Sequence, residues 1–176
     1  MRYIAIFVSI LLSGCVGVPE GIEPVRGFDA KRYLGTWYEI ARLDHSFEQD
    51  LQAVTAEYSP REDGGISVIN RGFNVSSKTW SEAEGKAYFV EDENTGHLKV
   101  SFFGPFYGSY IVFSLGENYE YSLVTSSEKS YLWLLSRTPA INKALQKRLV
   151  AHMAEMGFDT DTLIFVEHNK NCYLQH

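Results

Sequence analysis

The sequence is poor in cysteine, in clustered basic residues and in long apolar runs, and each shortage excludes a class of protein. Only 2 cysteines, Cys15 and Cys172, occur among 176 residues, so the protein is not a disulfide scaffold. The 16 basic residues are scattered and outnumbered by 22 acidic residues, which argues against a nucleic-acid partner. The apolar run 3–12 falls short of the roughly 20 residues that a membrane-spanning helix needs.

The residues that are abundant favour β-structure. Phe and Tyr, which favour strands, occur 11 times each. Strand-like runs separated by turn residues lie at about 37–45, 51–59, 65–73, 81–91, 97–103, 109–115, 119–126 and 131–137. Their spacing, with no helical pattern between them, predicts one all-β domain, an eight-stranded antiparallel up-and-down barrel.

One α-helix is predicted after the last of these strands. Thr138-Pro139 is a favourable helix start, and Gly157 a favourable stop. Between them, apolar residues recur at every fourth position: Ile141, Leu145, Leu149 and Met153. Because the strand at 131–135 is apolar on both faces, we expect this helix to pack outside the barrel and cover it; a membrane-binding helix is the less favoured alternative. Residues 163–166 could add one short strand.

The first fifteen residues have the form of a secretion signal. A basic start and the apolar run 3–12 are followed by Leu12-Ser13-Gly14-Cys15; a buried N-terminal strand is the less favoured alternative. Residues 12–15 resemble the lipobox of bacterial lipoproteins. That resemblance implies cleavage before Cys15, a diacylglycerol thioether on its sulfur, and an acyl chain such as palmitate on its new amino group. Val16 in place of Asp implies sorting to the outer membrane, on its periplasmic face.

These signals divide the chain into four parts. Residues 1–14 are predicted as the signal peptide, and 15–27 as the lipidated N-terminus with a tether rich in Pro and Gly. Residues 28–168 form the barrel and its helix, and 169–176 a polar tail.

Strand order predicts which residues meet at each end of such a barrel. Trp37 opens the first strand and Arg137 closes the eighth, so both lie at the same end. An Arg guanidinium stacked on an indole contributes roughly 0.5–2 kcal/mol, and the pair would close the floor. Phe106 and Tyr107, between the fifth and sixth strands, fall at the open mouth. Glu39 shares the parity of Trp37, and we expect it to accept hydrogen bonds inside the barrel rather than act as an acid catalyst.

An eight-stranded barrel can hold one small ligand. Alternation along the strands predicts an apolar inward-facing set, as suits an acyl chain: Val54, Phe89, Val100, Phe102, Tyr110, Val112, Leu123 and Trp133. Plain core packing is the alternative for each of them.

Several motifs together resemble the lipocalin family. Gly35-Thr36-Trp37 matches its Gly-x-Trp motif, Arg137 before Thr138-Pro139 matches its third conserved region, and residues 117–119 match its Thr-Asp-Tyr region only loosely. The resemblance covers about 28–166 and is strongest to bacterial outer-membrane lipoproteins of the family. It implies a lipid-binding protein that stores or transports fatty acids, phospholipids or lysophospholipids for membrane maintenance.

Evidence for covalent chemistry is weak. The 5 histidines show no close ligand pairing, which argues against a metal or haem, and no Gly-x-Ser-x-Gly elbow is present. Some lipocalins are isomerases that use a cysteine inside the barrel, but Cys172 lies in the tail, either as a free thiol or in an intermolecular bridge. We therefore predict no enzyme and no cofactor, and regard a homodimer as open. The alternatives are a lipid-metabolising enzyme and a structural or interaction lipoprotein with a filled barrel.

Overall fold

The computed structural model describes residues 16–168. The lipidation predicted at Cys15 and the thiol of Cys172 lie outside the described residues. The elements are α1 (Ala30–Tyr33), β1 (Gly35–Arg42), β2 (Leu51–Pro60), β3 (Ile66–Asn74), β4 (Thr79–Phe89), β5 (His97–Ser101), β6 (Gly108–Leu115), β7 (Tyr121–Thr125), β8 (Leu132–Ser136), α2 (Lys143–Glu155), a 3-10 turn (Thr160–Thr162) and β9 (Ile164–Phe165).

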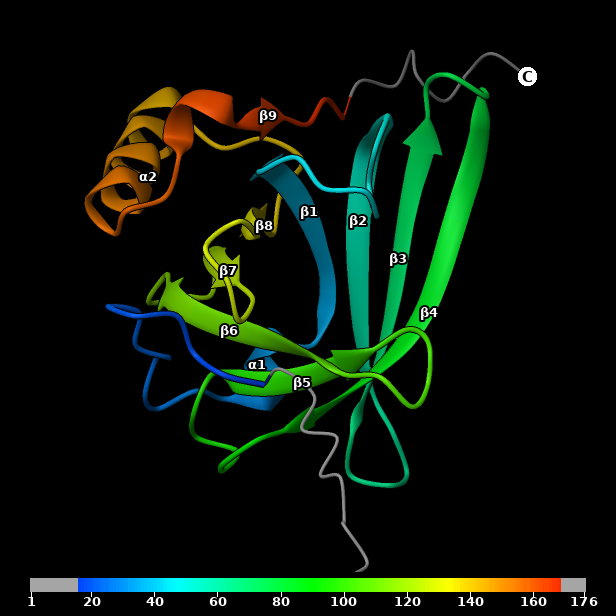
Figure 1. Cartoon of the computed structure of the whole chain (residues 1–176), viewed down its shortest axis with the longest axis vertical. Helices are drawn as coiled ribbons and strands as arrows, with labels where there is room; N and C mark the ends of the chain where they lie inside the picture. The colour runs from blue at the N-terminus through cyan, green and yellow to red at the C-terminus, as the bar shows by residue number, and fades with distance from the viewer. Residues whose placement is uncertain (1–15, 169–176) are drawn as a thin grey trace, which may run out of the picture.

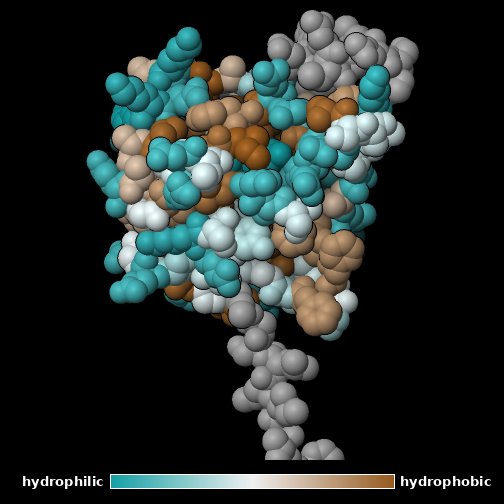
Figure 2. Space-filling model, turned by 45° about the horizontal axis from the view of Figure 1, so that its top comes forward, coloured by the Kyte–Doolittle hydropathy of each residue, from teal (hydrophilic) through white to brown (hydrophobic). Residues whose placement is uncertain are grey.

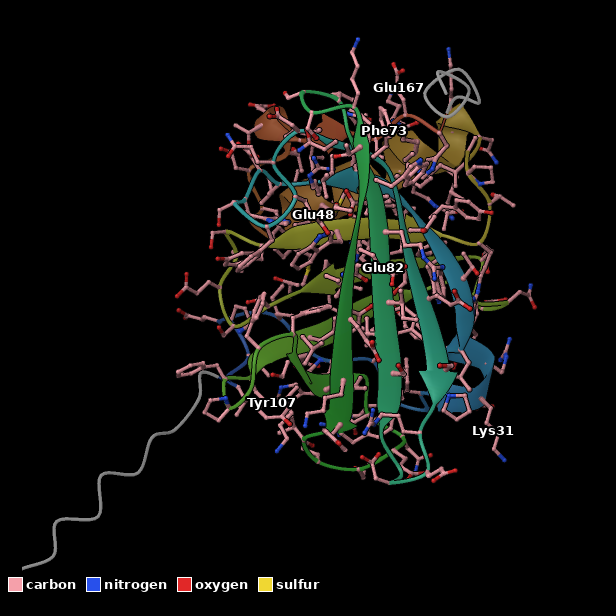
Figure 3. The ribbon with its side chains drawn as sticks, turned by 90° about the vertical axis from the view of Figure 1, so that its right-hand side faces the viewer. Lys31, Glu48, Phe73, Glu82, Tyr107 and Glu167 are labelled. Atoms are coloured by element: carbon pink, nitrogen blue, oxygen red, sulfur yellow. The ribbon has the colours of Figure 1, made fainter. Side chains whose placement is uncertain are left out.

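Eight antiparallel strands close into a barrel. The sheet order is β2-β3-β4-β5-β6-β7-β8-β1-β9, and a further pairing of β1 with β2 closes the ring. The short β9 pairs with the end of β1 outside it. Figure 1 shows α2 lying outside the barrel, and Figure 3 shows Lys31 of α1 and Phe73 of β3 at opposite ends. The predicted all-β fold with one outer helix and a short added strand is confirmed.

The barrel separates two apolar clusters, one inside and one under α2. The inner cluster is built around Trp37, and the outer one includes Leu132 and Leu134 of β8 with Leu149 and Met153 of α2. All five of these side chains are at most 2% exposed. The helix therefore covers the strand that is apolar on both faces, as its sequence predicts.

The start of α2 differs from the prediction. Its N-cap is Asn142, whose Oδ1 accepts a hydrogen bond from the backbone N–H of Leu145 at 2.8 Å. The side-chain cap supplies the partner that a helix start needs, so the helix begins after Thr138-Pro139 rather than at it. Gly157, at φ 84°, ends the helix as expected.

The segment before the barrel lies against its outer wall instead of extending away from it. The backbone N–H of Val25 donates to Val112 O at 2.9 Å, and Ile22 is 4% exposed within the outer cluster. Nearer its start, Gly17 O accepts a hydrogen bond from Ser109 Oγ at 2.9 Å. The N-terminal segment is thus attached to β6 along most of its length.

Within residues 16–168, no helix has the length and apolar character needed to cross a membrane.

Candidate ligand-binding cavity

The barrel encloses a cavity of about 110 Å³ with a predominantly apolar wall. Five of the residues that alternation predicts to face inward line it: Val54, Val100, Phe102, Tyr110 and Trp133. The volume is several times what one water molecule needs, so the cavity can take part of an acyl chain.

Three residues of the predicted set do not line the cavity. Phe89 and Val112 belong to the inner cluster, but their side chains are used in packing, Phe89 against Phe28. The prediction was wrong for Leu123, which belongs to the outer cluster under α2. Val124, the next residue of β7, belongs to the inner cluster instead, so this strand has the opposite alternation to the prediction.

The floor is closed by Trp37, which is fully buried. Gly35 adopts φ 92°, a conformation that disfavours other residues, and brings the chain from α1 into β1. The indole Nε1 donates to Tyr33 O at 2.8 Å. Arg137 Cζ lies 3.9 Å from the indole ring centre, which is the stack that strand order predicts.

Arg137 also bonds to the backbone around the floor. Its Nη1 donates to Thr36 O at 2.9 Å and its Nη2 to Arg32 O at 2.6 Å. These carbonyls belong to the end of α1 and the start of β1, so one side chain joins the last barrel strand to the chain entering the first. Burial lowers the pKa of Arg137, but a guanidinium remains charged at neutral pH.

Beside the floor, three tyrosines form a hydrogen-bonded group. Tyr110 Oη lies 2.8 Å from Tyr33 Oη and 2.9 Å from Tyr58 Oη, and Tyr33 Oη is 2.9 Å from Ser122 Oγ. Burial raises the pKa of Tyr33 to about 12 and also raises those of Tyr58 and Tyr110. The hydroxyls are therefore neutral at physiological pH and satisfy one another inside an apolar wall.

Higher in the wall, Arg42 links two carboxyl groups. Its Nη1 donates to Glu39 Oε1 at 2.7 Å, and its Nη2 donates to the backbone oxygens of Glu48 and Leu51. Glu48 Oε2 accepts from Trp133 Nε1 at 3.1 Å and lies 3.2 Å from His45 Nε2. This group joins β1, the loop after it and β8, and both carboxyl groups border the cavity.

The two carboxyl groups have opposite pKa shifts. Burial, together with the nearby charge of Glu48, raises the pKa of Glu39 well above its ordinary value. Burial also raises the pKa of Glu48, but the closeness of His45 and the indole N–H of Trp133 outweigh it and lower the pKa overall. Of the two carboxyl groups, Glu48 therefore ionises first as pH rises, and Arg42 lies beside the charge that it gains.

The loop between β5 and β6 carries exposed aromatic side chains. Phe106 is 74% exposed, as predicted, whereas Tyr107 is half-buried with its ring 5.3 Å from Lys99 Nζ. Phe103, which sequence reasoning did not single out, is 77% exposed.

Tyr107 packs near Tyr88, whose hydroxyl donates to Asp63 in the turn between β2 and β3. Figure 3 shows Tyr107 at the same end of the barrel as Lys31 of α1, so this loop does not lie at the opposite, open end that strand order predicts.

The polar groups at the cavity bond mainly to one another, and no group of three or more His, Cys, Asp and Glu side chains in the described part of the chain could hold a metal. Sequence reasoning missed the partners of Glu39 and the tyrosine group. The short spacing of Glu39, Arg42 and Glu48 was a visible signal, whereas the contacts of Tyr33, Tyr58 and Tyr110 join distant strands.

Comparison with known proteins agrees with this geometry. Residues 28–168 match the family model of the lipocalin-like domain. The chain is 56% identical over 163 residues to the outer membrane lipoprotein Blc of Vibrio cholerae. This alignment covers 92% of this chain and 95% of that protein. The Escherichia coli K12 protein of the same name is 51% identical over 85% of this chain and 84% of its own length. Insecticyanin from the tobacco hornworm Manduca sexta shares the fold, with a TM-score of 0.71 at 21% identity over 89% of each chain.

The chain therefore belongs to the lipocalin family. Within that family it is most usefully compared with the Blc lipoproteins, because these relatives match it over more than four-fifths of its length.

Proposed function

We propose that this protein is a lipid-binding lipoprotein, anchored through acylated Cys15 to the periplasmic face of the outer membrane. It stores or transports fatty acids, phospholipids or lysophospholipids for membrane maintenance. One observation carries the proposal: a closed barrel with a sealed floor encloses an apolar cavity of about 110 Å³. The names of its Blc relatives support the membrane location.

Binding proceeds by transfer of an acyl chain from water into this cavity. Each buried methylene contributes about 0.8 kcal/mol, so even part of a chain gives useful affinity. The head group remains at the mouth in water, because Glu39, Arg42 and Glu48 already pair with one another in the wall. No bond is made or broken in the lipid.

The test is native mass spectrometry of the mature protein after exposure to a C16 fatty acid and a matched lysophospholipid. We expect one bound lipid per chain and quenching of tryptophan fluorescence, since Trp133 lines the cavity. No bound lipid and no quenching with either ligand would refute the proposal. Release of free fatty acid from the bound lysophospholipid would instead identify a lipid-metabolising enzyme.

A further inference from the structure

The loop between β5 and β6 exposes two phenylalanines next to each other. Phe103 and Phe106 are 77% and 74% exposed, more than any other large hydrophobic side chain among the described residues. The N–H of Phe106 donates to Phe103 O at 3.1 Å, which closes a turn between them. Exposed aromatic side chains in such a turn are typical of a surface that contacts another apolar phase.

The beginning of the described chain lies beside this loop. Ser109 follows the loop in β6, and its Oγ donates to Gly17 O at 2.9 Å. Cys15 is two residues before Gly17, and two extended residues span only about 7 Å. Figure 3 shows the labelled Tyr107 at the corner of the barrel where the described chain begins.

This attachment determines where the acyl chains of Cys15 can enter a membrane. Because Ile22 and Val25 also pack on the barrel, the segment from 17 to 26 cannot act as a long spacer. Acyl chains on Cys15 therefore enter the bilayer within a short distance of Phe103 and Phe106. Figure 2 shows hydrophobic side chains at the edge of the surface close to where the described chain begins.

The base of the loop adds a favourable charge. Lys99 Nζ lies 5.3 Å from the ring centre of Tyr107. A cation and an amphipathic ring therefore lie together at the base of the loop that carries the two phenylalanines. Lysine and tyrosine suit the headgroup layer, whereas phenylalanine suits the acyl boundary beneath it.

We propose that the β5–β6 loop inserts Phe103 and Phe106 into the phospholipid leaflet that holds the acyl chains of Cys15. This edge of the barrel then lies against the membrane. The proposal rests on the acylation in the proposed function and adds the orientation of the barrel. Because Phe102 lines the cavity and adjoins Phe103, a lipid leaving the leaflet reaches the cavity along this loop.

The experiment compares Phe106→Trp with Phe165→Trp in the acylated mature protein. Phe165 is 46% exposed in β9, on a different side of the barrel, and serves as the matched control. Both proteins are reconstituted into vesicles of phosphatidylethanolamine and phosphatidylglycerol, with or without brominated acyl chains. We expect the emission added at position 106 to be quenched at least about twofold more than that added at position 165. Equal quenching at the two positions would overturn the proposal.

Two further measurements separate this proposal from the proposed function. Intact mass confirms acylation at Cys15; a mature protein without acyl chains would overturn the docking proposal, because its premise fails. Native mass spectrometry measures lipid binding by the same variants. Lipid binding without preferential quenching at 106 refutes docking alone, whereas preferential quenching without lipid binding supports docking and refutes the proposed function.

Discussion

Filling the cavity should weaken lipid binding strongly without unfolding the barrel. Val100 of β5 lines the cavity, and its neighbours across the two adjacent strands are the small residues Ala87 and Gly108. Val100→Trp therefore places an indole in space that is open in the native protein. The barrel should tolerate the change, because the added ring occupies the cavity instead of a packed core.

The expected loss follows from the volume that the indole removes. If the ring displaces about four methylene groups of the ligand, the loss is about 3 kcal/mol at 0.8 kcal/mol per methylene. That energy corresponds to roughly a 150-fold weaker dissociation constant. The melting temperature should remain within a few degrees of the native value.

The assay is an isothermal calorimetric titration with a C16 fatty acid, because a heat signal is not disturbed by the new tryptophan. Lys99→Trp is the control, since Lys99 adjoins Val100 in β5 and alternates to the outer face. We expect native affinity for Lys99→Trp. A folded Val100→Trp protein that binds the fatty acid within threefold of the native protein would show that ligands do not enter this cavity.

Three further predictions concern the floor and the buried polar groups. Arg137→Ala should lower the free energy of unfolding by about 2–4 kcal/mol, because it removes the stack on Trp37 and two hydrogen bonds to carbonyls. Urea unfolding measures this, and Arg148→Ala, at an exposed position of α2, should change it by less than about 0.5 kcal/mol. Tyr110→Phe should cost about 1–2 kcal/mol in the same assay, since Tyr33 and Tyr58 each lose a buried partner, and a neutral result would argue against the tyrosine group. The raised pKa of Glu39 means that its folded form holds a proton that the unfolded chain releases near 4.5, so stability falls as pH rises from there through the folded pKa. Glu39→Gln should reduce this slope at pH values above the ordinary pKa of a glutamate, and an unchanged slope would contradict the raised pKa of Glu39.

The sequence predicted what depends on local pattern and strand order. Alternation and turn residues identify all eight barrel strands, and counting strands brings Arg137 to Trp37 across a hundred positions of chain. Both inferences hold because a closed up-and-down barrel has a single strand order, in which each strand lies between its two neighbours in sequence and the last pairs with the first.

Parity failed in β7. Val124 faces the interior and Leu123 faces α2, and because both are apolar the sequence does not indicate which of the two faces is the inner one. The start of α2 was misplaced because Thr138-Pro139 and Asn142 both suit a helix start, and only packing decides between them. The course of the N-terminal segment depends on pairing with Gly96 and Val112, which its Pro- and Gly-rich composition does not reveal.

The charges in the wall determine how a ligand lies in the cavity. Glu48 ionises before Glu39 and gains its negative charge beside Arg42, so that charge is balanced without a ligand. A carboxylate or phosphate at that depth would lose its hydration and face the charge of Glu48, with Arg42 already occupied. An acyl chain meets no such cost against Val54, Val100 and Phe102. We therefore expect a single-chain lipid to enter tail first toward Trp37 and to leave its head outside the cavity.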